Sequence, residues 1–213
     1  VAFSGGYFYL LIPENVTLRG AGMDITTLVA HGSANAAAYG GLIAPKGAVD
    51  AVAAYGGGFN TRISDLTLEA NSQSDENGIN INCCHADGFI AERVRINGSK
   101  YHGLEWNQSR RGRFIDCVFS GEYSGGSGSW VQFDIGASGP KSTAVTGVAT
   151  LDVIFDRCRF EQRPATDSSF RDIDLAHTST FTVDGVKFID CELTGRNVSG
   201  SIILAVDSAQ TGA

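Results

Sequence analysis

The same short strand pattern occurs five times along this chain, and this repetition limits the possible folds more than any other feature. The five segments are ISDLTL (63–68), AERVRI (91–96), FIDCVF (114–119), FDRCRF (155–160) and FIDCEL (188–193). Each alternates apolar and polar residues, which is the period of a half-buried strand. Alignment gives one inward column of Leu66, Val94, Cys117, Cys158 and Cys191, and a second of Leu68, Ile96, Phe119, Phe160 and Leu193.

A solenoid explains both the constancy of this strand and the variation in its spacing. The interval between members of a column ranges from 23 to 41 residues. A repeat that keeps its strand and varies its insertion is typical of stacked coils. We also expect a second strand in each coil, at 78–82, 103–107, 130–135, 171–175 and 201–206. The pattern therefore predicts an all-β solenoid of parallel strands. A β-sandwich would need antiparallel pairing and would leave the cysteine column unexplained.

Composition agrees with a single elongated domain spanning 1–213. Hydrophobic residues make up 43% of the chain, which is enough for a continuous core. Gly is frequent, with 27 residues against 4 Pro, as expected for many tight turns between short strands. The chain opens on an apolar run at residues 8–12 that has the character of mid-strand sequence. We therefore expect a fragment of a longer polypeptide.

Charge argues against a nucleic-acid partner. The net charge is −7, and the densest basic cluster is Arg110, Arg111 and Arg113, which we interpret as a solvated turn. No apolar run approaches the length of a membrane span, so no membrane insertion is expected.

The five cysteines are interpreted as structural. Three of them occupy the first inward column, where Cys behaves as a small hydrophobe, and we expect reduced, buried thiols there. The adjacent Cys83 and Cys84 have no second Cys or His pair at metal-ligand spacing, so no metal site is predicted.

Three segments resemble a known superfamily. They are IPENVTLRGAG (12–22), DENGININ (75–82) and IDCVF (115–119), and they look like the opening and the internal coils of the pectate-lyase-like right-handed parallel β-helices. That superfamily includes pectate lyases, polygalacturonases and phage tailspike depolymerases. The resemblance implies a single-stranded right-handed parallel β-helix. It does not fix an activity, because one fold hosts many functions and the catalytic motifs of the polygalacturonases and pectate lyases are missing from this sequence.

Strand alternation predicts a polar face on the second strands. The side chains expected to point outward are Asn80, Asn82, Glu105, Asn107, Gln132, Asp134, Asp172 and Asp174. Amides and carboxylates suit sugar hydroxyls, and glycoside cleavage needs two carboxyl groups. We therefore predict that Glu105, Asp134, Asp172 and Asp174 form an exposed acidic strip, flanked by the insertions at 120–129 and 136–150, and that they are the catalytic candidates. Glu105 and Asp134 on adjacent rungs would lie roughly 5 Å apart, as in retaining enzymes, and Glu105 and Asp172 roughly 9–10 Å apart, as in inverting enzymes.

Further residues complete the candidate sugar-binding set. It comprises Asn80, Asn82, Asn107, Gln132, Tyr101, His102 and Trp130, because amides bind hydroxyls and sugars stack on aromatic rings. A lyase would instead need a base beside Ca²⁺, with Arg171, Asp172 and Asp174 as candidates. Apart from that case, no cofactor is expected.

The sequence leaves two classes of function open. The first is a carbohydrate-active, tailspike-like protein that degrades a surface polysaccharide, by hydrolysis or as a lyase. The second is a non-catalytic carbohydrate-binding or structural module of a virion or cell surface. Both imply a polysaccharide partner and a location on a virion tail or outside the cell. The resemblance to tailspikes adds a possible homotrimer.

Overall fold

The computed structural model describes residues 8–29, 41–46, 57–69, 79–98, 102–121, 129–133, 150–161, 171–175, 183–194 and 202–206. Its strands in the first half of the chain are β1 (Phe8–Ile12), β2 (Thr17–Arg19), β3 (Thr27–Val29), β4 (Gly41–Pro45), β5 (Arg62–Glu69), β6 (Ile79–Cys84), β7 (Ile90–Asn97) and β8 (His102–Asn107). Those in the second half are β9 (Gly112–Ile115), β10 (Val118–Ser120), β11 (Ser129–Phe133), β12 (Thr150–Asp156), β13 (Arg159–Phe160), β14 (Arg171–Leu175), β15 (Val183–Ile189), β16 (Glu192–Leu193) and β17 (Ile202–Val206).

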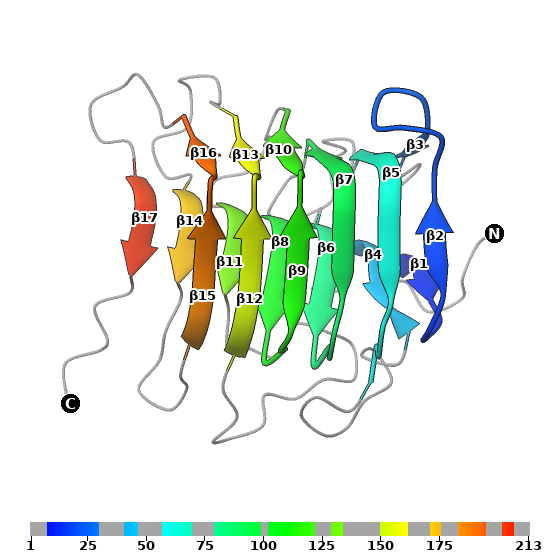
Figure 1. Cartoon of the computed structure of the whole chain (residues 1–213), viewed down its shortest axis with the longest axis horizontal. Helices are drawn as coiled ribbons and strands as arrows, with labels where there is room; N and C mark the ends of the chain where they lie inside the picture. The colour runs from blue at the N-terminus through cyan, green and yellow to red at the C-terminus, as the bar shows by residue number, and fades with distance from the viewer. Residues whose placement is uncertain are drawn as a thin grey trace.

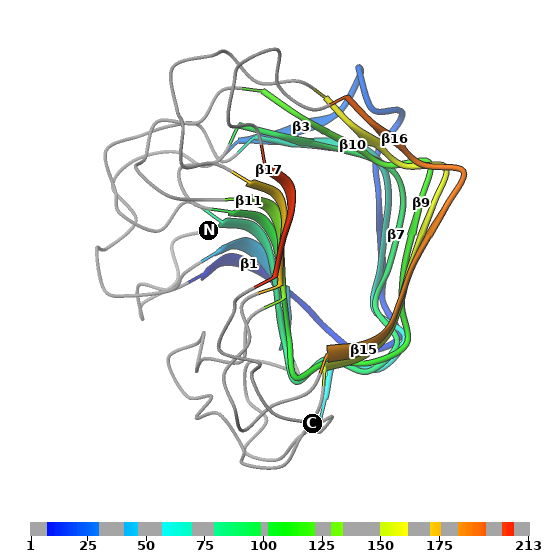
Figure 2. The same ribbon diagram turned by 90° about the vertical axis from the view of Figure 1, so that its left-hand side faces the viewer.

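The strands form two parallel sheets that face each other across the core (Figures 1 and 2). The seven-stranded sheet has the order β1-β4-β6-β8-β11-β14-β17, and the ten-stranded sheet contains the remaining strands. Successive strands of each sheet come from successive passes of the chain, so neighbours far apart in sequence lie side by side. The prediction of an all-β chain with parallel pairing is confirmed.

The ten-stranded sheet bends sharply along one line, which gives the cross-section its corner in Figure 2. The residues at this bend all have positive φ: Asp65 (56°), Arg93 (51°), Asp116 (51°), Arg157 (51°) and Asp190 (50°). Each is the third residue of one of the five repeated segments. The last three segments were predicted as single strands, and this is wrong, because the left-handed residue divides them into β9 and β10, β12 and β13, and β15 and β16.

Both predicted inward columns are present and line the core. Leu66 lies level with Val94, and Phe119 lies level with both Ile96 and Phe160. Leu66, Val94, Cys117 and Cys158 are at most 1% exposed, and Cys191 is half-buried. The register of the strands on either side places Cys117, Cys158 and Cys191 on consecutive rungs.

Aromatic rings stack between coils beneath the bend. The rings of Phe119 and Phe160 lie 4.6 Å apart at 11°, and those of Phe114 and Phe155 lie 5.0 Å apart at 14°. Phe188 extends the second stack at 4.9 Å from Phe155. Such offset pairs contribute about 0.5–1.5 kcal/mol each beyond their buried area, so the stacks help to hold the register.

The cysteine thiols bond to the backbone of a neighbouring coil. The Cys158 thiol donates to the Phe114 carbonyl oxygen at 3.3 Å, and the Cys191 thiol donates to the Phe155 carbonyl oxygen at 3.3 Å. The neighbouring Cys117 thiol, together with burial, raises the pKa of Cys158 well above its usual value. Cys83, Cys117, Cys158 and Cys191 are free thiols in this structure. The first three are buried as expected, whereas Cys191 is only half-buried.

Candidate functional site

The register of the seven-stranded sheet places four predicted site residues in one row. Asn82 on β6 lies level with Glu105 on β8, Glu105 with Gln132 on β11, and Gln132 with Asp174 on β14. Two predicted pairings are corrected by this register. The neighbour of Glu105 on the adjacent strand is Gln132 rather than Asp134, and the aspartate level with Glu105 two strands away is Asp174 rather than Asp172. At the usual strand spacing, the backbones at Glu105 and Asp174 are about 10 Å apart.

The exposure predicted for this face is wrong at β6 and β8. Asn80, Asn82, Glu105 and Asn107 are each at most 1% exposed. The Asn82 side-chain amide donates to the Glu105 carboxylate at 2.7 Å, and the Asn80 amide donates to the Gly98 carbonyl oxygen at 2.9 Å. Every residue of β8 is buried, on the outward side as well as on the core side. Strand alternation had identified the outward side correctly, but it carries no information on whether that side meets water.

His102 is also buried, at 2% exposed. Burial lowers its pKa to about 3, because the charged imidazolium is poorly solvated there. The ring is therefore neutral near pH 7 and is a weak general base. This does not favour a catalytic role for His102.

Part of the predicted site lies outside the described residues. That applies to Tyr101, Asp134 and nearly all of the two flanking insertions. For Trp130, Gln132, Asp172 and Asp174 the structure describes the strand position but not the side chain. Their predicted roles therefore stay predictions.

A second polar surface lies on the outer face of the ten-stranded sheet. There, five residues on neighbouring strands lie level with one another: Arg62, Ile90, Arg113, Ile154 and Lys187. We call this set the cation row. It alternates between a positive side chain and an isoleucine, so consecutive cations stand two strands apart, at about 10 Å.

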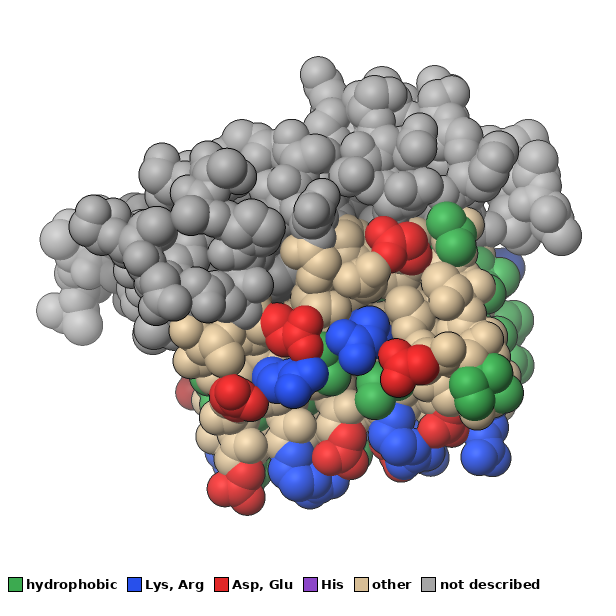
Figure 3. Space-filling model, turned by 90° about the horizontal axis from the view of Figure 1, so that it is seen from above, with side chains coloured by type: hydrophobic (Ala, Val, Ile, Leu, Met, Phe, Trp, Pro, Cys, Tyr) green, Lys and Arg blue, Asp and Glu red, His purple; other side chains and the backbone are tan. Residues whose placement is uncertain are grey.

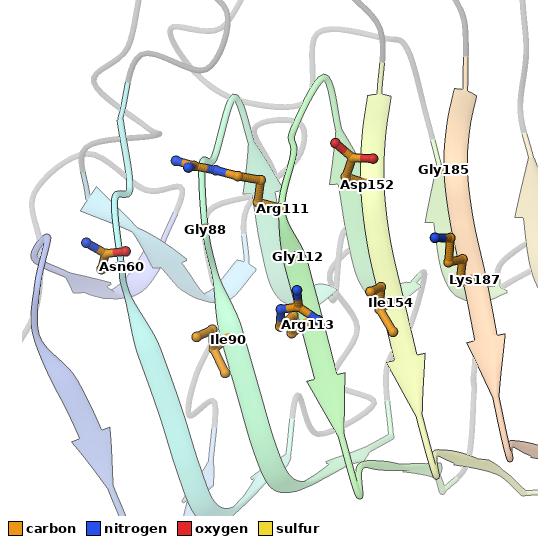
Figure 4. A pocket seen from close by; sticks show the side chains of 10 residues that line it. All are labelled: Asn60, Gly88, Ile90, Arg111, Gly112, Arg113, Asp152, Ile154, Gly185 and Lys187. Atoms are coloured by element: carbon orange, nitrogen blue, oxygen red, sulfur yellow. The ribbon is translucent and has the colours of Figure 1, made fainter.

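An open hollow of about 410 Å³ lies over the cation row. Figure 4 shows Ile90, Arg113, Ile154 and Lys187 across its width, with Arg111 and Asp152 above them. Gly88 and Gly185 lie beside these two charged residues and have no side chain to fill the space. A Cβ on Gly185 would come within 2.7 Å of the Asp152 carboxylate, and the φ of +70° at Gly185 favours glycine as well.

Most charges near the hollow are neutralised within the protein. The Asp87 side chain is fully buried and forms ion pairs with Arg110 at 2.8 Å and with Arg111. Burial by itself would raise the pKa of Asp87, but the two guanidinium hydrogen bonds outweigh it and lower the pKa. Arg62 pairs with Glu92. Within the described part of the chain, Arg113 and Lys187 are exposed and form no ion pair.

The bend carries a different arrangement, which we call the corner ladder: Asp65, Arg93, Asp116, Arg157 and Asp190, with signs that alternate from coil to coil. Asp65 pairs with Arg93 at 2.6 Å, and Asp116 pairs with Arg157 at 2.8 Å. The Arg93 hydrogen bond is the largest influence on Asp65 and holds its pKa at about 2. Figure 3 shows acidic and basic side chains alternating along the lower edge of the molecule in that view.

Neither charged column was recognised in the sequence, although a signal for each was present. The cation row consists of the residue immediately before each repeated segment, and the corner ladder consists of the third residue of each segment. Comparing the polar positions of the alignment as carefully as the apolar ones would have found both. The basic cluster at residues 110–113 is also more than a solvated turn, because Arg110 and Arg111 neutralise buried Asp87 and Arg113 lies in β9.

Neither a cluster of metal ligands nor a membrane-spanning helix is present among the described residues. No group of three or more His, Cys, Asp or Glu side chains within them could hold a metal ion. No helix in the same residues is long and apolar enough to cross a membrane. Comparison of the whole chain with known proteins found no matching family model, no matching curated protein and no matching solved structure.

Proposed function

We propose that the chain is a right-handed parallel β-helix that binds a polysaccharide on the outer face of its ten-stranded sheet. The observation that carries the proposal is the hollow over the cation row, where charged and aliphatic side chains recur at strand spacing. A polymer of regularly spaced units is the ligand that a regularly spaced surface suits best.

The chemistry of the lining supports a sugar ligand. Asn60, Arg113, Asp152 and Lys187 offer both donors and acceptors to hydroxyl groups, and Ile154 offers an apolar surface to the C–H face of a sugar ring. Small-molecule sites are usually enclosed and mostly apolar. This hollow is only partly enclosed, and its lining is polar and apolar in about equal measure, which favours an extended chain lying across it over a compact ligand.

We also propose that the chain is part of a tailspike-like protein. A tailspike-like module on a virion tail or outside the cell would meet polysaccharide at a cell surface. A homotrimer is the assembly that the resemblance to tailspikes implies.

Hydrolysis is the second candidate function, and it rests on the row of Glu105 and Asp174. Their backbones are about 10 Å apart, and in inverting glycosidases the two carboxyl groups themselves lie about 6.5–9.5 Å apart. Glu105 is 1% exposed and already accepts a hydrogen bond from Asn82, so it would have to be uncovered before it could reach a glycosidic oxygen. This burial is why we favour binding over cleavage.

A polysaccharide panel tests both functions. The protein is incubated with capsular and O-antigen polysaccharides, and binding, new reducing ends and the ultraviolet absorbance of unsaturated sugars are measured. Binding without product supports the proposal. Reducing ends alone would show hydrolysis, and reducing ends with absorbance would show a lyase, for which added Ca²⁺ is then tested. Loss of product in Glu105→Gln would locate the chemistry in the seven-stranded sheet. Absence of binding to the whole panel would overturn the proposal.

A further inference from the structure

We infer that the hollow binds a linear anionic polysaccharide that carries one acidic group on every second sugar and runs along the cation row. This inference rests on the proposed polysaccharide binding and specifies the ligand of the same surface. It follows from which charges are neutralised, how the remaining ones are spaced, and what lies between them.

The first step is the charge that remains after internal pairing. Glu92 pairs with Arg62 and Arg93, and Asp156 pairs with Arg157. Glu92 and Asp156 therefore each have an arginine partner, although Asp156 shares Arg157 with Asp116. Arg113 and Lys187 are left, and in the described part of the chain only Asp152 opposes them within the hollow. The hollow keeps a net positive charge even though the whole chain carries −7.

The second step is spacing. Arg113 and Lys187 lie level on β9 and β15, with Ile154 of β12 between them. Two strand spacings make about 10 Å, which is about the length of two sugar units in an extended chain. A polymer with a carboxylate or sulfate on alternate sugars can place successive charges on successive cations. A polymer with an acid on every sugar would place an anion over Ile154, away from both cations.

The third step is the side chain between the cations. Ile90 and Ile154 are half-buried and stand on the outward side of the sheet at the cation level. An aliphatic side chain there can pack against the apolar face of the uncharged sugar and offers nothing to an anion. The alternation of cation and isoleucine therefore matches an alternation of acidic and neutral sugars.

Asp152 provides a test of the charge of the ligand, because removing its carboxylate should strengthen the binding of an anion. Its carboxylate lies in the hollow and repels an anionic ligand. Asp152→Asn removes that charge, and Asn tolerates the φ of 48° at this position. The variant should bind a polyanion more tightly, whereas loss of a carboxylate that served only to accept hydroxyl hydrogen bonds would weaken binding.

The experiment compares three polymers on the intact protein: hyaluronan, with a carboxylate on alternate sugars, polygalacturonate, with one on every sugar, and neutral dextran. Dissociation constants are measured by titration calorimetry at low and high salt. We expect hyaluronan to bind best and to weaken with salt. Arg113→Gln and Lys187→Gln should each weaken it about tenfold, the scale of one charged hydrogen bond. Asp152→Asn should strengthen it, and Arg159→Gln, an exposed arginine paired with Glu161 outside the hollow, should change nothing.

Each contrary result has a defined meaning. Equal binding of dextran would overturn the anionic ligand while leaving polysaccharide binding intact. A preference for polygalacturonate would overturn the spacing argument, and weaker hyaluronan binding by Asp152→Asn would overturn the role of charge. Failure to bind hyaluronan, with binding to another member of the wider panel, would reject this inference alone. No binding to any polysaccharide would reject the proposed function with it. Concentration-dependent oligomers abolished by Arg113→Gln would show that the surface is an interface between copies, and would also overturn it.

Discussion

The corner ladder and the cation row are built on the same sheet from charged residues that recur coil by coil, but they balance charge in opposite ways. In the corner ladder the signs alternate from coil to coil, and four of the five charges form ion pairs with each other, Asp65 with Arg93 and Asp116 with Arg157. In the cation row all charges are positive, and isoleucines separate them. Most charges of the corner ladder are therefore neutralised by each other, and few remain to bind a ligand. In the cation row Arg113 and Lys187 form no ion pair among the described residues, and only Asp152 opposes them within the hollow.

A substitution in the core beneath the corner ladder should cause the largest loss of unfolding free energy. Cys158 lies under the bend and is 1% exposed, so Cys158→Asp would place an unpaired carboxylate in the core. We expect a loss of unfolding free energy of several kcal/mol, about 3 or more. Thermal and urea denaturation followed by circular dichroism measures it. Cys158→Ala is the matched control and should cost clearly less, and equal losses in the two variants would contradict the argument.

Reversing one charge should destabilise the protein in the corner ladder but not in the cation row. Arg93→Asp removes the partner of Asp65 and places three acids on consecutive coils, whereas Arg113→Asp changes the same residue type on the sheet face. We expect Arg93→Asp to lower the unfolding free energy measurably, and Arg113→Asp to stay within about 0.5 kcal/mol of the native value. The Arg93→Asp loss should shrink at high salt, since salt screens exposed charges. If both reversals cost the same, the proposed difference between the columns does not exist.

Acid should weaken the ladder within a defined pH range. Arg93 lowers the pKa of Asp65 from 3.8 to about 2, so the contribution of this carboxylate to stability is fully present above about pH 4. It is lost as the pH falls from about 4 to 2, because the unfolded chain then takes up a proton before the folded chain does. The difference in unfolding free energy between the native protein and Asp65→Asn should be constant above that range and should shrink within it. A difference that does not change down to pH 2 would refute the assignment.

The smallest change in stability is expected at Lys187. Its substitution should weaken polysaccharide binding without lowering the unfolding free energy. Lys187→Gln removes an exposed cation that has no ion pair among the described residues, so the unfolding free energy should stay within about 0.5 kcal/mol of the native value. Denaturation curves measure this, and they also validate the binding assays on the same variant. A larger loss would mean that Lys187 has a structural role and belongs with the ladder.

Sequence reasoning predicted what depends on local periodicity. The columns through Leu66 and Leu68 follow from the apolar positions of one repeated segment, and the stacking of coils follows from their recurrence. The bend was missed because nothing in the residue type at Arg93 or Arg157 requires positive φ, although Asp adopts it more readily than most residues. The exposure of Glu105 was predicted wrongly because burial of an outward face depends on segments distant in sequence. The row shared by Glu105 and Asp174 was predicted on the correct face, but with the wrong partners, because register is set by the whole sheet.

The alternating signs at the bend also constrain how a chain of this design can change its length. Coils of two kinds follow each other, one with an acid at the bend and one with a base, from Asp65 through Asp190. Duplicating a single coil, or deleting one from the interior of the column, would bring two like charges together at the junction. Adding or removing coils in pairs keeps the signs of the bend residues alternating. In proteins that evolve from such a chain, coils should therefore be inserted or deleted two at a time, unless a substitution at the bend accompanies the change.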